Sequence, residues 1–147
     1  MDSGFTHASL TDLMTNPDKP GTRWEVSPQL GIMGYNFNVA VLEPGDRLSQ
    51  NAFHAHANQE EFFFVVSGRC RVETATDSFD CNADEMVLFR RGAVHLLHNP
   101  YEEPCRSVAI GYPATGRRPV ESVADVETLL KERYPDGDVG RGPAHLD

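Results

Sequence analysis

The sequence lacks several features that would assign it directly to a class of protein. It has three cysteines, Cys70, Cys81 and Cys105, and no CxxC pair, which disfavours a disulfide framework and a cysteine-ligated zinc site. No apolar run approaches the ~20 residues of a membrane span. There is also no GxSxG nucleophile elbow and no GxxxxGK[ST] phosphate loop. We therefore expect a soluble protein with reduced, mostly buried thiols.

Positive charge is also scarce. The chain has 13 basic residues against 22 acidic ones, a net charge of −9, and its only lysines are Lys19 and Lys131. A nucleic-acid partner needs a basic face to neutralise phosphates, so this balance disfavours one. An acidic surface with few lysines fits a salt-rich habitat, although codon bias explains it equally well. The N-terminus has neither the basic start nor the apolar block of a signal peptide, so we expect a cytoplasmic protein with no membrane partner.

What the sequence does contain is a long region with a β pattern. A chain of 147 residues fits one domain with a sizeable core. From residue 24 to 112, short β-branched and aromatic runs alternate with turn signals, which predicts an all-β sandwich or barrel. We divide the single domain into an irregular segment (1–23), a β-barrel (24–112), a loop with a C-terminal helix (113–135) and a tail (136–147). Within the barrel we expect strands at 35–41, 61–66, 69–74, 78–81, 86–89, 94–98 and 105–110.

One α-helix is predicted, after the loop at 113–119. Ser122 can cap it and Asp125 completes a variant capping box, while Pro135 and Gly137 stop it. One apolar face of this helix is formed by Val123, Val126, Leu129, Leu130 and Tyr134. That face must be buried, either on the outside of the barrel or across a dimer.

The stretch FHAHANQEEFFFVVSG, residues 53–68, carries the chemistry. Alternate side chains of a strand share a face, so His54 and His56 point the same way with Cα atoms ~6 to 7 Å apart and can bind one divalent ion. After a polar bend, Glu61 opens the next strand and can supply a carboxylate, whereas Glu60 points the opposite way. Further on, His95 begins another strand.

His95 and His98 lie on opposite faces of the same predicted strand. His95 shares its face with Leu97 and Asn99, and His98 points to the opposite face. Each of these signals alone is common in proteins that bind no metal. Their order and spacing are more specific.

Together these residues resemble the two sequence motifs of the cupin superfamily. The first motif is matched by Gly45, His54, His56, Glu61 and Gly68, and the second by Gly92, His95 and Asn99. Three departures concern turns: eight residues separate Gly45 from His54 against a usual five, and Asp84 and Arg90 stand where the second motif has glycine and proline. All four ligand positions carry the expected residue types.

The resemblance implies an all-β cupin jelly roll, a double-stranded β-helix barrel, here with one C-terminal α-helix. It also implies one metal ion per chain inside the barrel, bound by three histidines and one glutamate: His54, His56, Glu61 and His95. Such a set suits Fe(II), Mn(II), Ni(II), Co(II) or Zn(II), and the sequence does not choose among them. The resemblance further favours a homodimer.

Two functions are open at this point. The first is a metal-dependent oxygenase, isomerase or lyase that acts on a small organic molecule. The second is a small-molecule-binding cupin that does no catalysis and whose metal is structural or sensing. Residues expected to line the pocket are Tyr35, Phe37, Phe63, Val65 and Leu97. Candidates for a general base, by proximity in sequence alone, are Glu60, Tyr35, His98 and Gln59.

Overall fold

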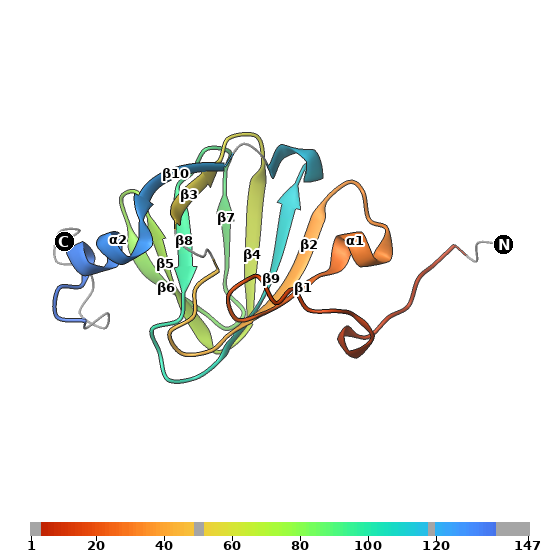
Figure 1. The fold of residues 1–147 in the computed structure, drawn as a ribbon, viewed down its shortest axis with the longest axis horizontal. Helices are drawn as coiled ribbons and strands as arrows, with labels where there is room; N and C mark the ends of the chain where they lie inside the picture. The colour runs from red at the N-terminus through yellow and green to blue at the C-terminus, as the bar shows by residue number, and fades with distance from the viewer. Residues whose placement is uncertain (1–3, 49–51, 118–119, 138–147) are drawn as a thin grey trace.

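Two antiparallel sheets of five strands each form the body of the molecule (Figure 1). A computed structural model describes residues 4–48, 52–117 and 120–137. The first sheet has the order β1 (Thr22–Glu25), β2 (Asn36–Leu42), β9 (Cys105–Tyr112), β4 (Glu60–Ser67) and β7 (Met86–Phe89). The second has the order β10 (Val120–Asp125), β3 (Ala52–His56), β8 (His95–His98), β5 (Arg69–Thr74) and β6 (Ser78–Asn82).

The main core lies between these two sheets. It draws Phe63 and Val65 from β4 and Val72 and Leu97 from the second sheet, and all four side chains are buried. Cys70, Cys81 and Cys105 lie in the same core as free thiols, as predicted. The all-β jelly roll predicted from the sequence is confirmed, and each of the expected strands is present to within two residues at either end.

Two tight turns show how local sequence sets this topology. Gly68 joins β4 to β5 with φ +73°, and a Cβ there would lie 2.2 Å from the carbonyl oxygen of Pro104, so only glycine fits. Asp84 stands where the cupin motif has glycine, yet it adopts φ 67° and keeps the left-handed turn before β7. Aspartate is one of the few side chains that tolerates this conformation. The departure at Asp84 therefore leaves the turn intact.

The C-terminal helix begins later than the sequence predicts. Helix α2 spans Val126–Arg133, and its N-cap is Asp125, whose carboxylate accepts a hydrogen bond from the Thr128 amide. Ser122, the predicted cap, belongs instead to β10. The reason is pairing: residues 120–125 add a strand to the edge of the second sheet beside β3, and this pairing overrides their weak helical pattern.

Three short helical segments were not predicted. They are the 3-10 turns Leu10–Asp12 and Ala114–Arg117 and the five-residue α1, Val26–Leu30, which connects β1 to β2. None of them reaches the length at which a periodic pattern becomes readable. No helix in the described part of the chain is long and apolar enough to cross a membrane.

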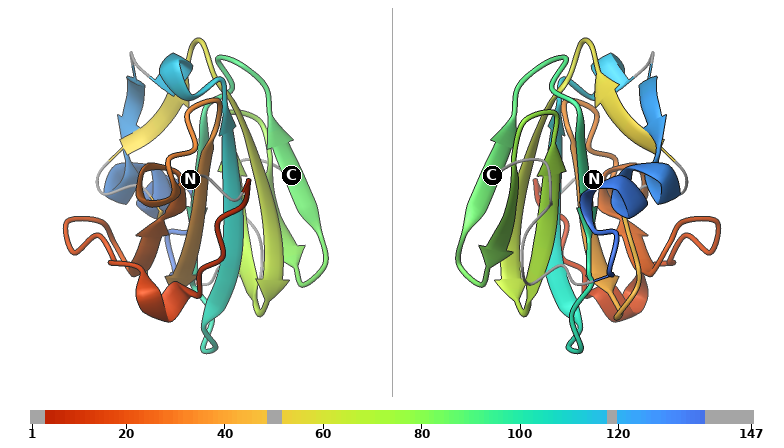
Figure 2. Two further views of the ribbon diagram at one scale, coloured as in Figure 1. Left: turned by 90° about the vertical axis from the view of Figure 1, so that its right-hand side faces the viewer. Right: turned by 90° about the vertical axis from the view of Figure 1, so that its left-hand side faces the viewer.

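Helix α2 covers part of the outer face of the second sheet. Figure 2 shows it beside β3 and β10, and Val126 and Leu129 pack against Leu96 of β8 in a small second core. Leu96 and Leu97 therefore lie on opposite sides of the sheet, in different cores. The helix covers its own barrel, which is the first of the two alternatives that the sequence left open.

Candidate metal centre

Four side chains converge between the sheets. They are His54 and His56 from β3, Glu61 from β4 and His95 from β8, and one potential ligand atom from each lies within 4.8 Å of all the others. This is the set that the cupin resemblance implies. His56 and His95 are buried, and His54 and Glu61 are half-buried.

Strand register explains why these residues meet. His54 is paired directly with His95 across β3 and β8, and Glu61 is paired with Phe89 and Gly111 on the inner face of the first sheet. The turn before β8 is tied back to β3, because the Gly92 amide donates a hydrogen bond to the His56 carbonyl at 2.9 Å. Two sheets thus present their donors to one point.

The polar atoms at this point lie close together. Glu61 Oε1 lies 2.5 Å from His56 Nε2 and 3.5 Å from His95 Nε2. Both Glu61 Oε1 and His95 Nε2 are buried without a hydrogen-bond partner among the described residues. Buried polar atoms are rarely left in this state, so the pair needs a further partner. One carboxylate oxygen and imidazole nitrogens directed at one point are the donor set of a divalent transition metal.

The charge state of Glu61 fits this donor set. Burial alone would raise the pKa of its carboxyl, but the neighbouring imidazoles of His56 and His95 outweigh burial and hold the pKa far below its ordinary value of 4.5. Glu61 is therefore a carboxylate at neutral pH.

His95 is oriented by groups outside the cluster. Its Nδ1 lies 2.9 Å from the Ala93 carbonyl oxygen, which can only accept, so Nδ1 donates and Nε2 presents a lone pair to the centre. Phe89 stacks on the ring with centroids 4.1 Å apart and planes 8° from parallel. Hydrogen bonding of the second nitrogen to a carbonyl is the usual support for a metal-ligating histidine.

Gln59 forms a polar wall next to Glu61. Its buried side chain lies over Gly111, where a Cβ would approach the amide to 2.8 Å, and its Nε2 donates to the Pro113 carbonyl at 3.0 Å. Gly111 is the register neighbour of Glu61, so the amide lies beside the carboxylate strand on the inner face. The absence of a side chain at Gly111 makes room for it.

Other predicted site residues lie elsewhere. Phe37 is paired with Ile110, which is paired in turn with Phe62, so Phe37 lies on the opposite face of the first sheet from Glu61 and does not line the centre as predicted. The prediction assumed that Phe37 and the alternate residues of β2 face inward. In the structure Asn36 and every second residue after it face inward instead. Tyr35 precedes β2 and is 41% exposed, which places it outside the core.

The remaining pocket predictions lie on the inner side of the sheets. Phe63 borders the cluster, with its ring centroid 6.2 Å from that of His95. Val65 and Leu97 are in the main core. Of the proposed bases, Glu60 pairs with the exposed Tyr112 and His98 contacts Glu73 on the outer face, as their strand positions predict.

Phe89 and the exact role of Gln59 were not foreseen. Phe89 is one apolar residue in a short strand, and only the pairing of β7 with β4 brings it to His95. The sequence places Gln59 in the bend between the two strands that carry His56 and Glu61. This position predicts that Gln59 lies near the centre but not which way its side chain points.

Comparison with known proteins agrees with this geometry. The model of the Cupin domain family matches residues 38–111, half of the chain. The chain belongs to the cupin family. The matched region contains every residue of the four-member cluster.

A curated relative and several solved structures are similar to this cupin. "Polyketide synthase CurC" from Streptomyces cyaneus is 33% identical over 78 residues, which span 53% of this chain but only 46% of that protein. The polyketide cyclase RemF from Streptomyces resistomycificus has a TM-score of 0.68 at 16% identity, covering 90% of this chain and 95% of RemF. A sugar phosphate isomerase of the cupin superfamily from Silicibacter pomeroyi has a TM-score of 0.65 at 19% identity, covering 73% and 75%. At these identities the structural likeness shows the fold alone.

Proposed function

We propose that this cupin binds one divalent transition-metal ion per chain through His54, His56, Glu61 and His95. The observation that carries the proposal is the pair of buried atoms, Glu61 Oε1 and His95 Nε2, that have no hydrogen-bond partner among the described residues. A metal ion at their meeting point would satisfy both. Iron, manganese, nickel, cobalt and zinc all suit this donor set.

We further propose that the loaded protein is an enzyme of the lyase or isomerase type, acting on a small molecule rich in carbonyl oxygens. When bound, the ion would supply a Lewis acid that polarises a carbonyl or enol oxygen. Ring closure of a β-keto chain is the specific candidate, because CurC and RemF carry names from polyketide synthesis. That reaction joins two carbons of one molecule and releases water, without dioxygen or an external reductant.

The residues around the centre suit such a substrate. Phe63 and Phe89 place apolar rings at His95, where they would exclude water from the reacting end. The Gln59 amide, next to Glu61 on the inner face, offers polar atoms to a keto or hydroxyl group. We assign no general base.

Metal binding is tested by elemental analysis of protein purified without chelator. We expect about one ion per chain in the natural protein, loss of the ion in His56→Ala and His95→Ala, and retention in the matched variant His98→Ala. His98 is a buried histidine of the same strand on the opposite face, so it controls for disturbance of β8. Equal loss in His95→Ala and His98→Ala would overturn the ligand assignment.

Reaction type is tested by incubating the loaded protein with a linear poly-β-ketone. Ring closure predicts a product lighter by one water, with no consumption of dissolved oxygen. Oxygen uptake that depends on the metal would instead favour an oxygenase. A loaded protein that binds such compounds without turnover would favour the second candidate, a binding or sensing cupin.

We also propose a homodimer formed through the outer face of the first sheet. Its supporting observation is a row of apolar residues across β2, β9, β4 and β7, namely Phe37, Ile110, Phe62 and Leu88, beside a second row that includes Phe64 and the 56% exposed Met86. A particle mass of 16.3 kDa in solution, the mass of one chain, measured by light scattering would contradict the dimer. A cytoplasmic location stays a prediction.

A further inference from the structure

A cavity lies on the other side of the second sheet from the metal centre. Its volume is about 340 Å³, and it is lined by the loop after β2, the end of β8 and the C-terminal part of α2. The metal centre uses His95 of β8, which points between the sheets, and the cavity uses His98, which points outward. The two sites are therefore separated by the sheet itself.

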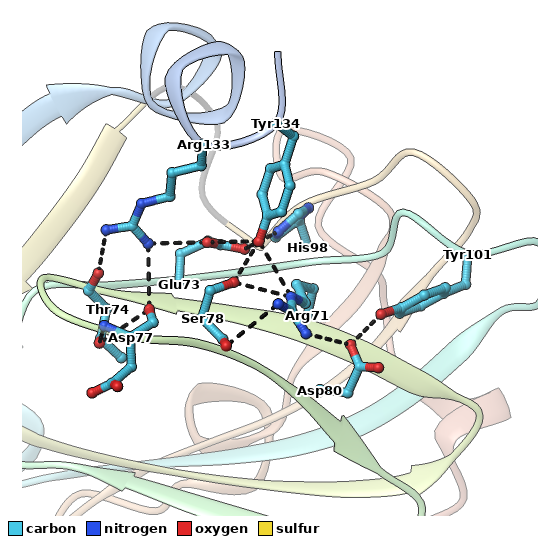
Figure 3. Close-up of polar contacts among 10 residues, drawn as sticks. All are labelled: Arg71, Glu73, Thr74, Asp77, Ser78, Asp80, His98, Tyr101, Arg133 and Tyr134. Carbon is cyan, nitrogen blue, oxygen red and sulfur yellow. Dashed lines mark hydrogen bonds and ion pairs between the residues drawn. The ribbon is translucent and has the colours of Figure 1, made fainter. Parts of the chain in front are cut away.

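His98 is held in this cavity by a buried carboxylate. Its Nε2 lies 2.8 Å from Glu73 Oε2, and the Glu73 side chain is fully buried. Glu73 also accepts hydrogen bonds from Tyr134 Oη at 2.8 Å and from Arg133 at 3.0 Å (Figure 3). Burial raises the pKa of Glu73, but His98, Arg133 and Tyr134 outweigh burial and lower it, so Glu73 is an anion that accepts from His98.

This arrangement leaves one nitrogen of His98 for a ligand. Because Nε2–H donates to Glu73, Nδ1 is the acceptor in the neutral ring. Nδ1 makes no hydrogen bond with the part of the chain that the structure describes, and the ring lines the cavity.

Two basic side chains line the cavity of this acidic protein. Arg47 and Lys131 both line it, and none of its described lining residues is acidic, although the chain carries a net charge of −9. Lys131 is one of only two lysines in the sequence. The rest of the lining is largely apolar, from Pro100, Leu130 and the ring of Tyr134. Behind His98, the charge of Glu73 is balanced by Arg133.

We propose that this cavity is a binding site for a small hydroxycarboxylic acid. Arg47 and Lys131 would take the carboxylate, Leu130 and Tyr134 would contact the apolar body, and His98 Nδ1 would accept a hydrogen bond from the hydroxyl. The volume falls in the range of small-molecule sites. The site is independent of the metal centre and of the proposed reaction.

The test uses 4-hydroxybenzoate as the probe, with benzoate and 4-hydroxybenzamide as controls that lack the hydroxyl and the charge. Binding is followed by NMR through the ring signals of the histidines, in the natural protein and in His56→Ala. We expect millimolar or tighter binding that shifts His98, weaker binding of both controls, and the same result in His56→Ala. If 4-hydroxybenzoate still binds to the His56→Ala variant, its carboxylate is not bound by a metal ion at the centre inside the barrel.

The matched variants are Lys131→Gln and Lys19→Gln, since these are the only two lysines and Lys19 lies in the 17–21 turn region, away from the cavity. Loss of one partly solvated cation should weaken 4-hydroxybenzoate about fivefold in Lys131→Gln and leave it unchanged in Lys19→Gln. The proposal is overturned if the probe does not bind at millimolar concentration, if its shifts centre on His54 and His95, or if both lysine variants bind equally well.

Discussion

Two glutamates lie next to histidines in this molecule, the half-buried Glu61 and the buried Glu73, and their carboxylates have different partners. Glu61 faces His56 and His95 inside the barrel, and its Oε1 has no hydrogen-bond partner among the described residues. Glu73 faces His98 outside the second sheet, and both its oxygens are bonded, to Arg133, Tyr134 and His98. In the described part of the chain, Glu61 Oε1 therefore lacks a hydrogen-bond partner, whereas both Glu73 oxygens have one.

The two carboxylates differ in the positively charged group that lies beside them. Arg133 supplies a permanent positive charge to Glu73, so that carboxylate needs nothing more. The histidines around Glu61 can supply charge only if they are protonated, and His95 is oriented to present a lone pair instead. A carboxylate beside imidazoles is a donor set that a divalent metal can use, whereas the Glu73 carboxylate already has a counter-charge in Arg133.

The largest expected effect is on stability. Glu73→Gln removes the buried carboxylate that pairs with the buried Arg133, and we expect a loss of about 3–5 kcal/mol in the free energy of unfolding. Glu61→Gln in chelator-treated protein should cost less than about 1 kcal/mol, since the amide can donate to an imidazole. Urea denaturation with chelator present measures both. Equal losses in the two variants would remove the distinction.

Metal affinity should show the reverse order. Glu61→Gln should weaken binding more than about tenfold because it removes a charged donor, while Glu60→Gln, one residue away on the opposite face, should not. Titration of the chelated protein with Zn(II) or Co(II) measures this. A comparable loss in Glu60→Gln would mean that the facing of β4 around Glu61 is wrongly assigned.

Lowering the pH should reduce the contribution of Glu73 to the free energy of unfolding. The pKa of Glu73 lies below its ordinary value of 4.5 in the folded protein, so its stabilising contribution is complete above that pH and is lost as the pH falls through the folded-state pKa. In chelator, the difference in unfolding free energy between the natural protein and Glu73→Gln should stay constant near neutral pH and narrow below about pH 4.5. A difference that narrows already at pH 6 would assign the effect to another group.

The smallest expected effect concerns the cap of the helix that completes the Glu73 site. Asp125→Ala removes the acceptor for the Thr128 amide and should cost about 1 kcal/mol. Glu127→Ala, an exposed first-turn change that spares the cap, is the control. Thermal unfolding of the two variants compares them, and equal midpoints would mean that the cap contributes nothing.

Much of this structure could be predicted from the sequence. Alternation alone placed His54 with His56 and separated His95 from His98, because strand geometry has a fixed period. The side of the sheet on which β2 puts its apolar residues could not be predicted, and Phe37 was misplaced, because both faces of that sheet are partly apolar. The Glu73 network was also out of reach, since Arg133 and Glu73 are 60 residues apart and meet only when α2 docks.

The pairing of β3 has a practical consequence for anyone who modifies this protein. Among the residues that the structure describes, this strand, which carries His54 and His56, is paired to β8 only at His54 and His95, whereas β10 pairs along it from Ala52 to His56. The C-terminal segment supplies no proposed ligand, yet it holds the ligand strand in place. A reporter or affinity tag fused near β10 could shift β3 and with it the positions of His54 and His56. The N-terminal region, where Phe5 is 74% exposed, is therefore the better point of attachment.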